Sequence, residues 1–196
     1  MRDGVFNAWF ITLSVATTIH LLRSNPSLLT EKIKPDASNQ KGWDKYLVPS
    51  LVIGFLIWII IMPLDAKRFG WSAGFPLWLK ILGGTILLPS SFFLYRANSD
   101  NAFVSPLVRI QEERSQTVIS TGVYGFVRHP MYLGGVLLLL GTPKLLGSYF
   151  GFIVSGLMAL LLIVRIVGEE AMLVEELKGY ADYREKVKYR LLPYIW

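Results

Sequence analysis

The sequence of 196 residues contains no cysteine, only two histidines and few charged side chains. The absence of cysteine excludes disulfides, cysteine nucleophiles and thiolate metal sites. With only His20 and His129 available as imidazole ligands, we expect no metal centre. Charged residues make up 17% of the chain, against about a quarter in average proteins. This deficit argues against a disordered chain, a nucleic-acid-binding domain and a soluble enzyme.

The sequence also lacks the glycine-rich motifs that usually hold nucleotides. It contains no G-x-x-x-x-G-K-[ST] loop and no G-x-G-x-x-G turn after a strand. A nucleotide-like ligand would therefore have to be held in another way.

Apolar residues are abundant instead, at 53% of the sequence, and the mean hydropathy is +0.44. We therefore predict an all-α, polytopic membrane protein with about five transmembrane helices. The five apolar segments are residues 5–22, 47–64, 76–95, 131–143 and 145–164. The first has no small-residue cleavage site, so we interpret it as an uncleaved span. The fourth would be only about 20 Å long, so it should be tilted, extended or buried among other helices.

Polar segments separate these spans, and an amphipathic helix follows them. The predicted connections are residues 23–46, 65–75 and 96–119. The pattern predicts a C-terminal amphipathic helix over residues 169–189, in which Tyr180 and Tyr183 mainly pack. Its apolar residues recur at helical spacing: Leu173, Leu177, Tyr180 and Val187.

Basic residues are distributed unevenly between the two sides of the predicted membrane protein. Residues 23–46, 96–130 and 165–196 carry 15 Lys and Arg, whereas the opposite side carries 4. Since positively charged loops face the cytoplasm, we predict that the N-terminus lies outside and that the C-terminal helix is cytoplasmic. We expect a single membrane domain over residues 1–196, with N-terminal spans in residues 1–95 and a candidate catalytic half in residues 96–196.

The first candidate site is the segment STGVYGFVRHPMYLG at residues 120–134, where polar and aromatic residues meet the start of an apolar helix. Pro130 suits the first position of that helix, whose free N–H groups would face a polar or anionic ligand. The alternative is a positively charged anchor with an aromatic belt, which needs no ligand. Four side chains crowd around this point: Tyr124, Arg128, His129 and Tyr132.

The second candidate site is the segment RIVGEE at residues 165–170. Arg165 and Glu169 are one helical turn apart, directly after a 20-residue apolar run, so they share a helix face at the membrane boundary. Ionisable groups in such positions are costly and are functional candidates. An interfacial ion pair between them is the alternative.

Together these features resemble the isoprenylcysteine carboxyl methyltransferase family of integral membrane methyltransferases. The resemblance rests on a G-x-Y-x-x-x-R-H-P-x-Y-x-G block at residues 122–134 and an R-x-x-x-E-E block at residues 165–170. Gly179, Tyr183 and a late L-P at residues 192–193 complete it. The order and spacing match over roughly the C-terminal half of the chain.

The resemblance implies S-adenosyl-L-methionine as methyl donor and a prenylcysteine carboxylate as acceptor. It also implies that Arg165 is catalytic and binds the substrate. In the family the donor pocket is made by the R-H-P-x-Y block, the stretch before it and a carboxylate of the C-terminal block. The residues implied to bind the cofactor are Gln116, Thr117, Val118, Ile119, Tyr124, His129, Pro130, Met131, Tyr132 and Glu169.

These residue types suit the chemical groups of the donor. Glu169 can accept hydrogen bonds from ribose hydroxyls or the ammonium group, and Arg128 and His129 can face the donor carboxylate. Tyr124 and Tyr132 can stack on adenine or line the sulfonium through cation–π contacts. Gln116–Ile119 would contribute backbone contacts.

The acceptor chemistry favours a carboxylate. Its unperturbed pKa lies near 4, so it is ionised at neutral pH and needs no general base. An amine acceptor would need one, and His129 and Glu169 are already assigned to the donor. Arg165 is left to hold an anion, while a prenyl chain would lie among apolar helices and membrane lipids.

Three alternatives stay open. A phospholipid or other lipophilic small-molecule methyltransferase would need the same donor pocket. A non-catalytic membrane scaffold or transporter-like protein is the second, and a transporter would be expected to show charges near the bilayer midplane and inverted repeats. A membrane reductase that uses NADPH is the third. No nucleic-acid partner is expected.

Overall fold

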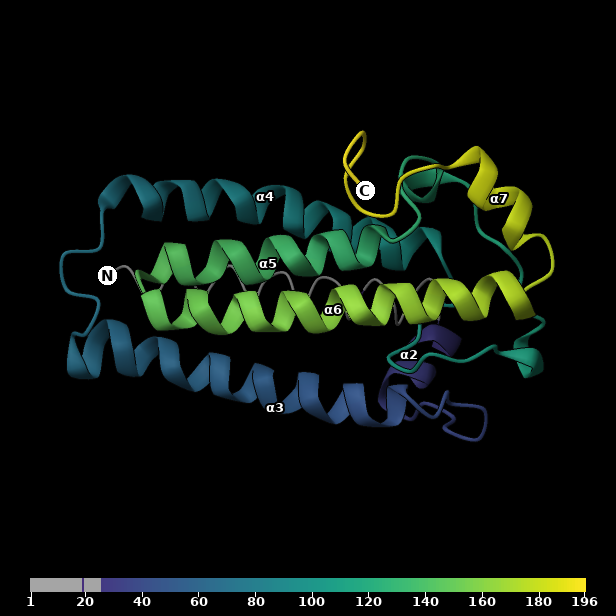
Figure 1. Cartoon of the computed structure of the whole chain (residues 1–196), viewed down its shortest axis with the longest axis horizontal. Coiled ribbons are helices and arrows are strands. Elements are labelled where there is room, and N and C mark those ends of the chain that lie inside the picture. The colour runs from purple at the N-terminus through teal and green to yellow at the C-terminus, as the bar shows by residue number, and fades with distance from the viewer. Residues whose placement is uncertain (1–18, 20–25) are drawn as a thin grey trace.

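The structure is a computed structural model that describes Ile19 and residues 26–196. Over these residues it is an elongated helical bundle without strands, which confirms the all-α prediction for them (Figure 1). The predicted span at residues 5–22 lies outside the described residues. The long helices of the bundle are α3 (Asp44–Pro63), α4 (Leu77–Asp100), α5 (Pro130–Leu146) and α6 (Tyr149–Glu176).

Three helices in the described part of the chain are long and apolar enough to cross a membrane. They are α3 with its π-helical extension (Asp44–Phe69), α4 and α6. The apolar side chains on their outer faces, such as Ile57, Leu88 and Leu160, are exposed. Large apolar surfaces of this kind belong in contact with lipid, so the chain is an integral membrane protein.

Helix α4 runs five residues past the predicted end of its span, as far as Asp100. Polar side chains stabilise this added turn. Asn98 Nδ2 donates to the Leu94 carbonyl at 2.6 Å, and Arg96 forms an ion pair with Asp100 at 2.8 Å. Such bonds satisfy polar groups without ending the helix.

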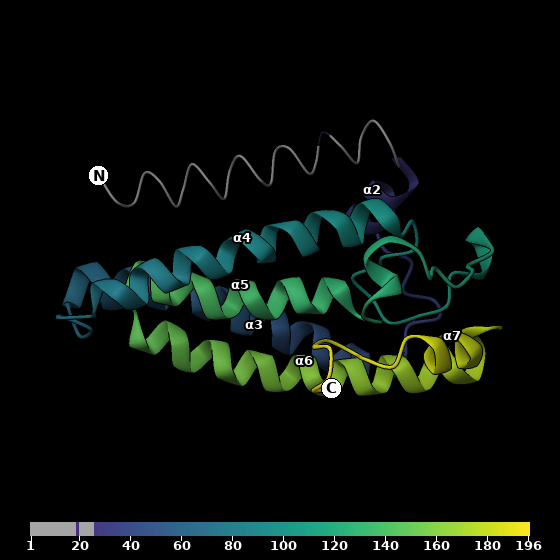
Figure 2. The same cartoon turned by 90° about the horizontal axis from the view of Figure 1, so that it is seen from above.

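Helix α5 is the short apolar segment, and its 17 residues span about 25 Å. It is extended at both ends and lies between α4 and α6 in both views (Figures 1 and 2). Glycines let it approach α4 closely, since a Cβ on Gly134 would lie 2.8 Å from Leu94 Cγ. Ser90 Oγ also donates to the Gly134 carbonyl at 2.8 Å. The prediction that this segment is extended and buried among other helices is confirmed.

The predicted loop over residues 23–46 is wrong in part, because Pro26–Ile33 forms helix α2. Pro26 opens the helix, where its missing N–H removes no helical hydrogen bond.

The predicted single helix over residues 169–189 is also wrong, because the chain breaks between α6 and α7 (Tyr180–Lys186). Gly179 has φ 87°, a left-handed conformation that interrupts a right-handed helix. The predicted packing is nevertheless confirmed, since Tyr180 and Tyr183 belong to one buried apolar cluster with Leu177 and Val187.

The ends of several helices meet at one end of the bundle. The start of α3, the end of α4, the start of α5 and the end of α6 lie there together with α2 and α7 (Figure 1). Both candidate segments from the sequence therefore lie at this end.

Candidate functional site

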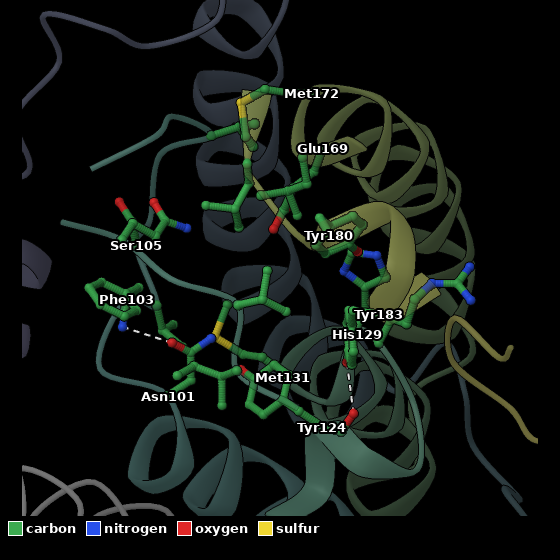
Figure 3. A pocket seen from close by; sticks show the side chains of 18 of the residues that line it. Asn101, Phe103, Ser105, Tyr124, His129, Met131, Glu169, Met172, Tyr180 and Tyr183 are labelled. Atoms are coloured by element: carbon green, nitrogen blue, oxygen red, sulfur yellow. Dashed lines mark hydrogen bonds between the residues drawn. The ribbon is translucent and has the colours of Figure 1, made fainter. Parts of the chain in front are cut away.

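A pocket lies among these helix ends, with about 790 Å³ of empty space that includes the part open to solvent. Its walls come from the segment after α4, the start of α5, the end of α6 and α7 (Figure 3). That these residues bind a cofactor stays a prediction. All ten residues predicted to bind it line this one pocket: Gln116, Thr117, Val118, Ile119, Tyr124, His129, Pro130, Met131, Tyr132 and Glu169.

One wall is the connection after α4, which has little regular secondary structure and is held by polar side chains. Gln111 Nε2 donates to the Phe103 carbonyl at 2.6 Å, and the Gln111 N–H donates to Gln116 Oε1 at 2.8 Å. Arg109 is buried and pairs with Glu31 of α2 at 2.9 Å. Hydrogen bonds within the connection and an ion pair with α2 thus hold the wall that carries residues 116–119.

The R-H-P block is held by the segment that follows α7. The N–H groups of Arg128 and His129 donate to the carbonyls of Tyr189 and Arg190, each at 2.9 Å. Pro130 then opens α5 as expected, with no side-chain cap on the helix N-terminus. The backbone of the R-H-P block is therefore held by residues that lie outside α5, the helix that begins at Pro130.

Glu170 is a buried carboxylate that ties the block to the same segment. It is 2% exposed and accepts hydrogen bonds from Nε of both Arg128 and Arg190. Arg128 Nη1 also donates to the Val187 carbonyl at 2.6 Å. Two guanidinium nitrogens of Arg128 are thus bonded within the protein, and the residue also lines the pocket. That it faces a donor carboxylate stays a prediction.

The neighbouring carboxylate, Glu169, lies in the pocket and has a different partner. The Tyr132 hydroxyl donates to Glu169 Oε2, which joins the R-H-P-x-Y block to the C-terminal block. A carboxylate has about four acceptor positions, so Glu169 retains capacity for a ligand. Two adjacent glutamates therefore have separate partners, one in the pocket and one behind it.

Arg165 does not line the pocket. Its Nε donates to Asp44 Oδ1 at 2.9 Å, and its Nη2 donates to the Pro106 carbonyl at 2.6 Å. Asp44 is fully buried and also accepts from the Val108 N–H at 2.9 Å. Arg165 thus pairs with the start of α3 and with the pocket wall, instead of with Glu169. Its catalytic role stays a prediction.

Two buried polar atoms of pocket residues have no hydrogen-bond partner. They are Nε2 of His129 and the hydroxyl of Tyr180, and each residue is only 4% exposed. The nearest acidic atom, Glu170 Oε1, is 3.9 Å from His129 Nε2. Burial lowers the pKa of His129, so the imidazole is neutral near pH 7. Unpaired buried polar atoms are costly, so these two atoms in the pocket wall are candidates for contact with a ligand.

The sequence does not reveal the contacts of Asp44 and Glu170 or the unpaired hydroxyl of Tyr180. Glu170 lies in the motif, but the resemblance assigns its preceding neighbour, Glu169. Tyr180 recurs at apolar helical spacing, which predicts that it mainly packs. Asp44 precedes an apolar run, and its partner Arg165 is 121 positions away, so no local pattern could connect them.

Comparison with known proteins places this site in a family context. Residues 102–175 match the model of the isoprenylcysteine carboxyl methyltransferase (ICMT) family. A protein-S-isoprenylcysteine O-methyltransferase of Schizosaccharomyces pombe is 34% identical over 85 residues, which are 42% of this chain and 36% of that protein. The Delta(14)-sterol reductase TM7SF2 of Mus musculus is 28% identical over 126 residues, which are 60% of this chain and 29% of that protein. The chain therefore spans about a third of the length of these curated relatives.

The fold is similar to a solved structure of the eukaryotic intramembrane Ras methyltransferase ICMT. The TM-score is 0.56 at 22% sequence identity, and the likeness covers 75% of this chain and 53% of the other. At this identity the likeness concerns the fold alone.

Proposed function

We propose that the chain is a member of the isoprenylcysteine carboxyl methyltransferase family, whose model matches residues 102–175, and that it methylates the C-terminal carboxylate of a prenylated cysteine with S-adenosyl-L-methionine. The observation that carries the proposal is the convergence of the R-H-P-x-Y block and Glu169 on one pocket, at the end of an apolar helical bundle. A soluble donor and a lipid-linked acceptor can meet at such a boundary.

The pocket residues fit this donor. Glu169 can bind the ribose hydroxyls or the ammonium group, and His129 Nε2 lacks a partner in the protein. Tyr124 and Met131 supply aromatic and apolar surface for the adenine and the thioether. When bound, the donor supplies a methyl group, whose S–C bond breaks with its electron pair left on sulfur while the acceptor oxygen bonds to carbon.

The properties of His129 favour a carboxylate acceptor over an amine. A carboxylate releases no proton on methylation, so the protein has only to align it and exclude water. An ammonium acceptor would first have to lose a proton. Burial lowers the pKa of His129, which makes it a weak base for that step. Arg165, held by Asp44 beside the pocket wall, is assigned to the acceptor carboxylate.

We also propose the arrangement in the membrane. The 15 to 4 distribution of basic residues assigns the pocket end to the cytoplasm and the N-terminus to the opposite side. The prenyl chain would then lie along the lipid-facing helices, and the donor would enter from the aqueous side. Residues 5–22 complete five spans in this arrangement.

Methyl transfer by the purified protein in detergent or lipid tests the proposal. A farnesylated cysteine analogue and phosphatidylethanolamine are offered side by side with radiolabelled donor. We expect a base-labile methyl ester on the first and no label on the second. Glu169→Gln should lower the affinity for S-adenosylhomocysteine about tenfold, while Glu175→Gln, an exposed carboxylate on the same helix, serves as the control. Label only on the amine lipid, or unchanged affinity in Glu169→Gln, would overturn these assignments.

A reductase is the second candidate, because a sterol reductase is among the curated relatives. It would bind NADPH in place of S-adenosyl-L-methionine. Thermal-shift measurements with each ligand separate the two, since a ligand that binds the native state raises the unfolding temperature. We expect stabilisation by S-adenosylhomocysteine and none by NADPH.

A further inference from the structure

Tyr180 and its neighbour Tyr183 differ in the partners of their hydroxyl groups. Both belong to α7, both line the pocket, and they are 4% and 5% exposed. The Tyr183 hydroxyl donates to the Tyr124 carbonyl at 2.7 Å, as the dashed line in Figure 3 marks. The Tyr180 hydroxyl has no partner in the protein. The Tyr183 hydroxyl therefore bonds within the protein, whereas the Tyr180 hydroxyl is available to a ligand.

The pocket wall holds a second unpaired polar atom. Tyr180, Tyr183 and His129 lie together on one side of the pocket, opposite Asn101 and Phe103 (Figure 3). His129 Nε2 also has no hydrogen-bond partner. Two polar groups from separate elements, both deeply buried, thus lie on the same side of one cavity.

Charges of both signs surround this side of the pocket. Glu170 is shared by Arg128 and Arg190, and Glu169 adds a second negative charge, so these four side chains carry no net charge. The uncapped N-terminus of α5 begins at the adjacent Pro130 and adds partial positive charge. Burial raises the pKa of Tyr180, so its hydroxyl keeps its proton and can donate it in a hydrogen bond.

We propose that the Tyr180 hydroxyl and His129 Nε2 bind the carboxylate at the amino-acid end of the methyl donor. The assignment rests on the proposed function and adds to it a direction for the ligand within the pocket. It makes Tyr180 a ligand-binding residue, although its position in the sequence indicates a packing residue.

Two ligands and two matched variants test the assignment. S-adenosylhomocysteine carries the amino-acid group, whereas 5′-methylthioadenosine keeps the adenine, ribose and thioether and lacks that group. Calorimetric titration of both is compared in the wild type, Tyr180→Phe and Tyr183→Phe, with the unfolding temperature measured for each. Both changes remove one hydroxyl and keep the ring.

In Tyr180→Phe we expect the affinity for S-adenosylhomocysteine to fall about tenfold or more, as for a lost hydrogen bond to a charged group. The affinity for 5′-methylthioadenosine and the unfolding temperature should not fall. In Tyr183→Phe the unfolding temperature should fall, and the ratio of the two affinities should stay as in the wild type.

Equal loss of both affinities in Tyr180→Phe would assign its hydroxyl to the nucleoside and overturn the proposal. A lower unfolding temperature without any selective loss of affinity would make Tyr180 a scaffold residue and also overturn it. If the wild type bound neither ligand, the proposed function itself would fail. A wild type that binds and methylates while Tyr180→Phe binds normally would refute only the present assignment.

Discussion

The two ends of the helical bundle each bury a carboxylate, and the protein satisfies these carboxylates in different ways. At the pocket end, Glu170 lies between the guanidinium groups of Arg128 and Arg190. A buried charge held by opposite charges stabilises only as long as every partner is present.

At the opposite end, Asp65 in the π-helical extension of α3 accepts hydrogen bonds from neutral groups. The hydroxyls of Ser72 and Ser148 donate to its Oδ2 at 2.7 and 2.6 Å, and the Phe150 N–H donates at 3.3 Å. These contacts join the turn after α3 to the start of α6. They close a structural junction, in which the other carboxylate oxygen, Asp65 Oδ1, has no hydrogen-bond partner. At the pocket end, by contrast, the two atoms without a partner belong to residues that line a cavity.

The comparison teaches that buried charge alone does not identify a functional end. Both ends contain a fully buried acidic residue, Asp44 at one and Asp65 at the other. Within the described part of the chain, the pocket end combines such a residue with a cavity lined by unpaired polar atoms. Four predictions test this difference between the two ends.

The largest effect is expected from Glu170→Gln. The change keeps the shape but leaves Arg128 and Arg190 without their shared counter-charge, and breaking a buried pair costs about 3–5 kcal/mol. Thermal unfolding in detergent measures the loss. Glu175→Gln, at an exposed position on the same helix, should leave the unfolding temperature within one degree or so, by the usual behaviour of surface substitutions. Equal effects in the two variants would contradict the ionic role of Glu170.

Asp44→Asn should come next, through its effect on Arg165. Loss of the charge that orients the guanidinium should lower turnover about a hundredfold, since small displacements near the chemistry have effects of that size. Affinity for S-adenosylhomocysteine should change by less than about twofold, because Arg165 does not line the pocket.

The coupling between these two residues provides the control. If Asp44 acts through Arg165, the turnover losses of Asp44→Asn and Arg165→Lys should be strongly non-additive in the double variant. Asp182→Asn on the exposed face of α7 should leave turnover unchanged. Additive losses, or a matching loss of donor affinity, would show that Asp44 acts elsewhere.

At the opposite end, Asp65→Asn should reduce the stability of the fold without changing the affinity for the ligand. Weakening its hydrogen bonds to Ser72 and Ser148 should cost about 1–3 kcal/mol. Titration of the folded variant with S-adenosylhomocysteine should give the wild-type affinity. A selective loss of affinity would mean that the two ends are coupled, and the contrast drawn above would fail.

The smallest effect is expected from the titration of His129. Burial holds its folded-state pKa below the ordinary value, so the unfolded chain binds more protons once the pH falls below about 6.5. Stability due to the neutral imidazole is therefore present above that pH and is lost as the pH falls. Between pH 7.5 and 5.5 the wild type should lose at most about 1.4 kcal/mol more than His129→Gln. Identical pH slopes for the two would show that His129 does not titrate as its burial requires.

The sequence carries much of this fold because lipid-facing helices are recognised by local composition. The apolar runs predict α3, α4 and α6, and the short run predicts a helix that is tilted, extended or buried, of which α5 is extended and packed between neighbouring helices. The added turn of α4 was missed because it depends on Asn98 and other side chains that bond to the helix itself. The break at Gly179 was missed because the apolar spacing continues across it.

The site was predictable where its residues lie within motifs and was not where they depend on tertiary contacts. The R-H-P block and Glu169 were found by spacing, and the pocket brings them together. The pairing of Arg165 with Asp44 joins two helices through the pocket wall, and nothing in either local segment specifies it. Local spacing does not reveal the feature of Tyr180 either, which is a buried hydroxyl without a hydrogen-bond partner.

The attachment of the R-H-P block to the carbonyls of Tyr189 and Arg190 has a consequence for biosynthesis. These carbonyls emerge from the ribosome about 60 residues after the block itself. Helices α5 and α6 can enter the membrane before that, but the backbone of Arg128 and His129 is not yet fixed. Donor binding should therefore be acquired in a late step of synthesis, when the segment after α7 docks on helices that are already inserted.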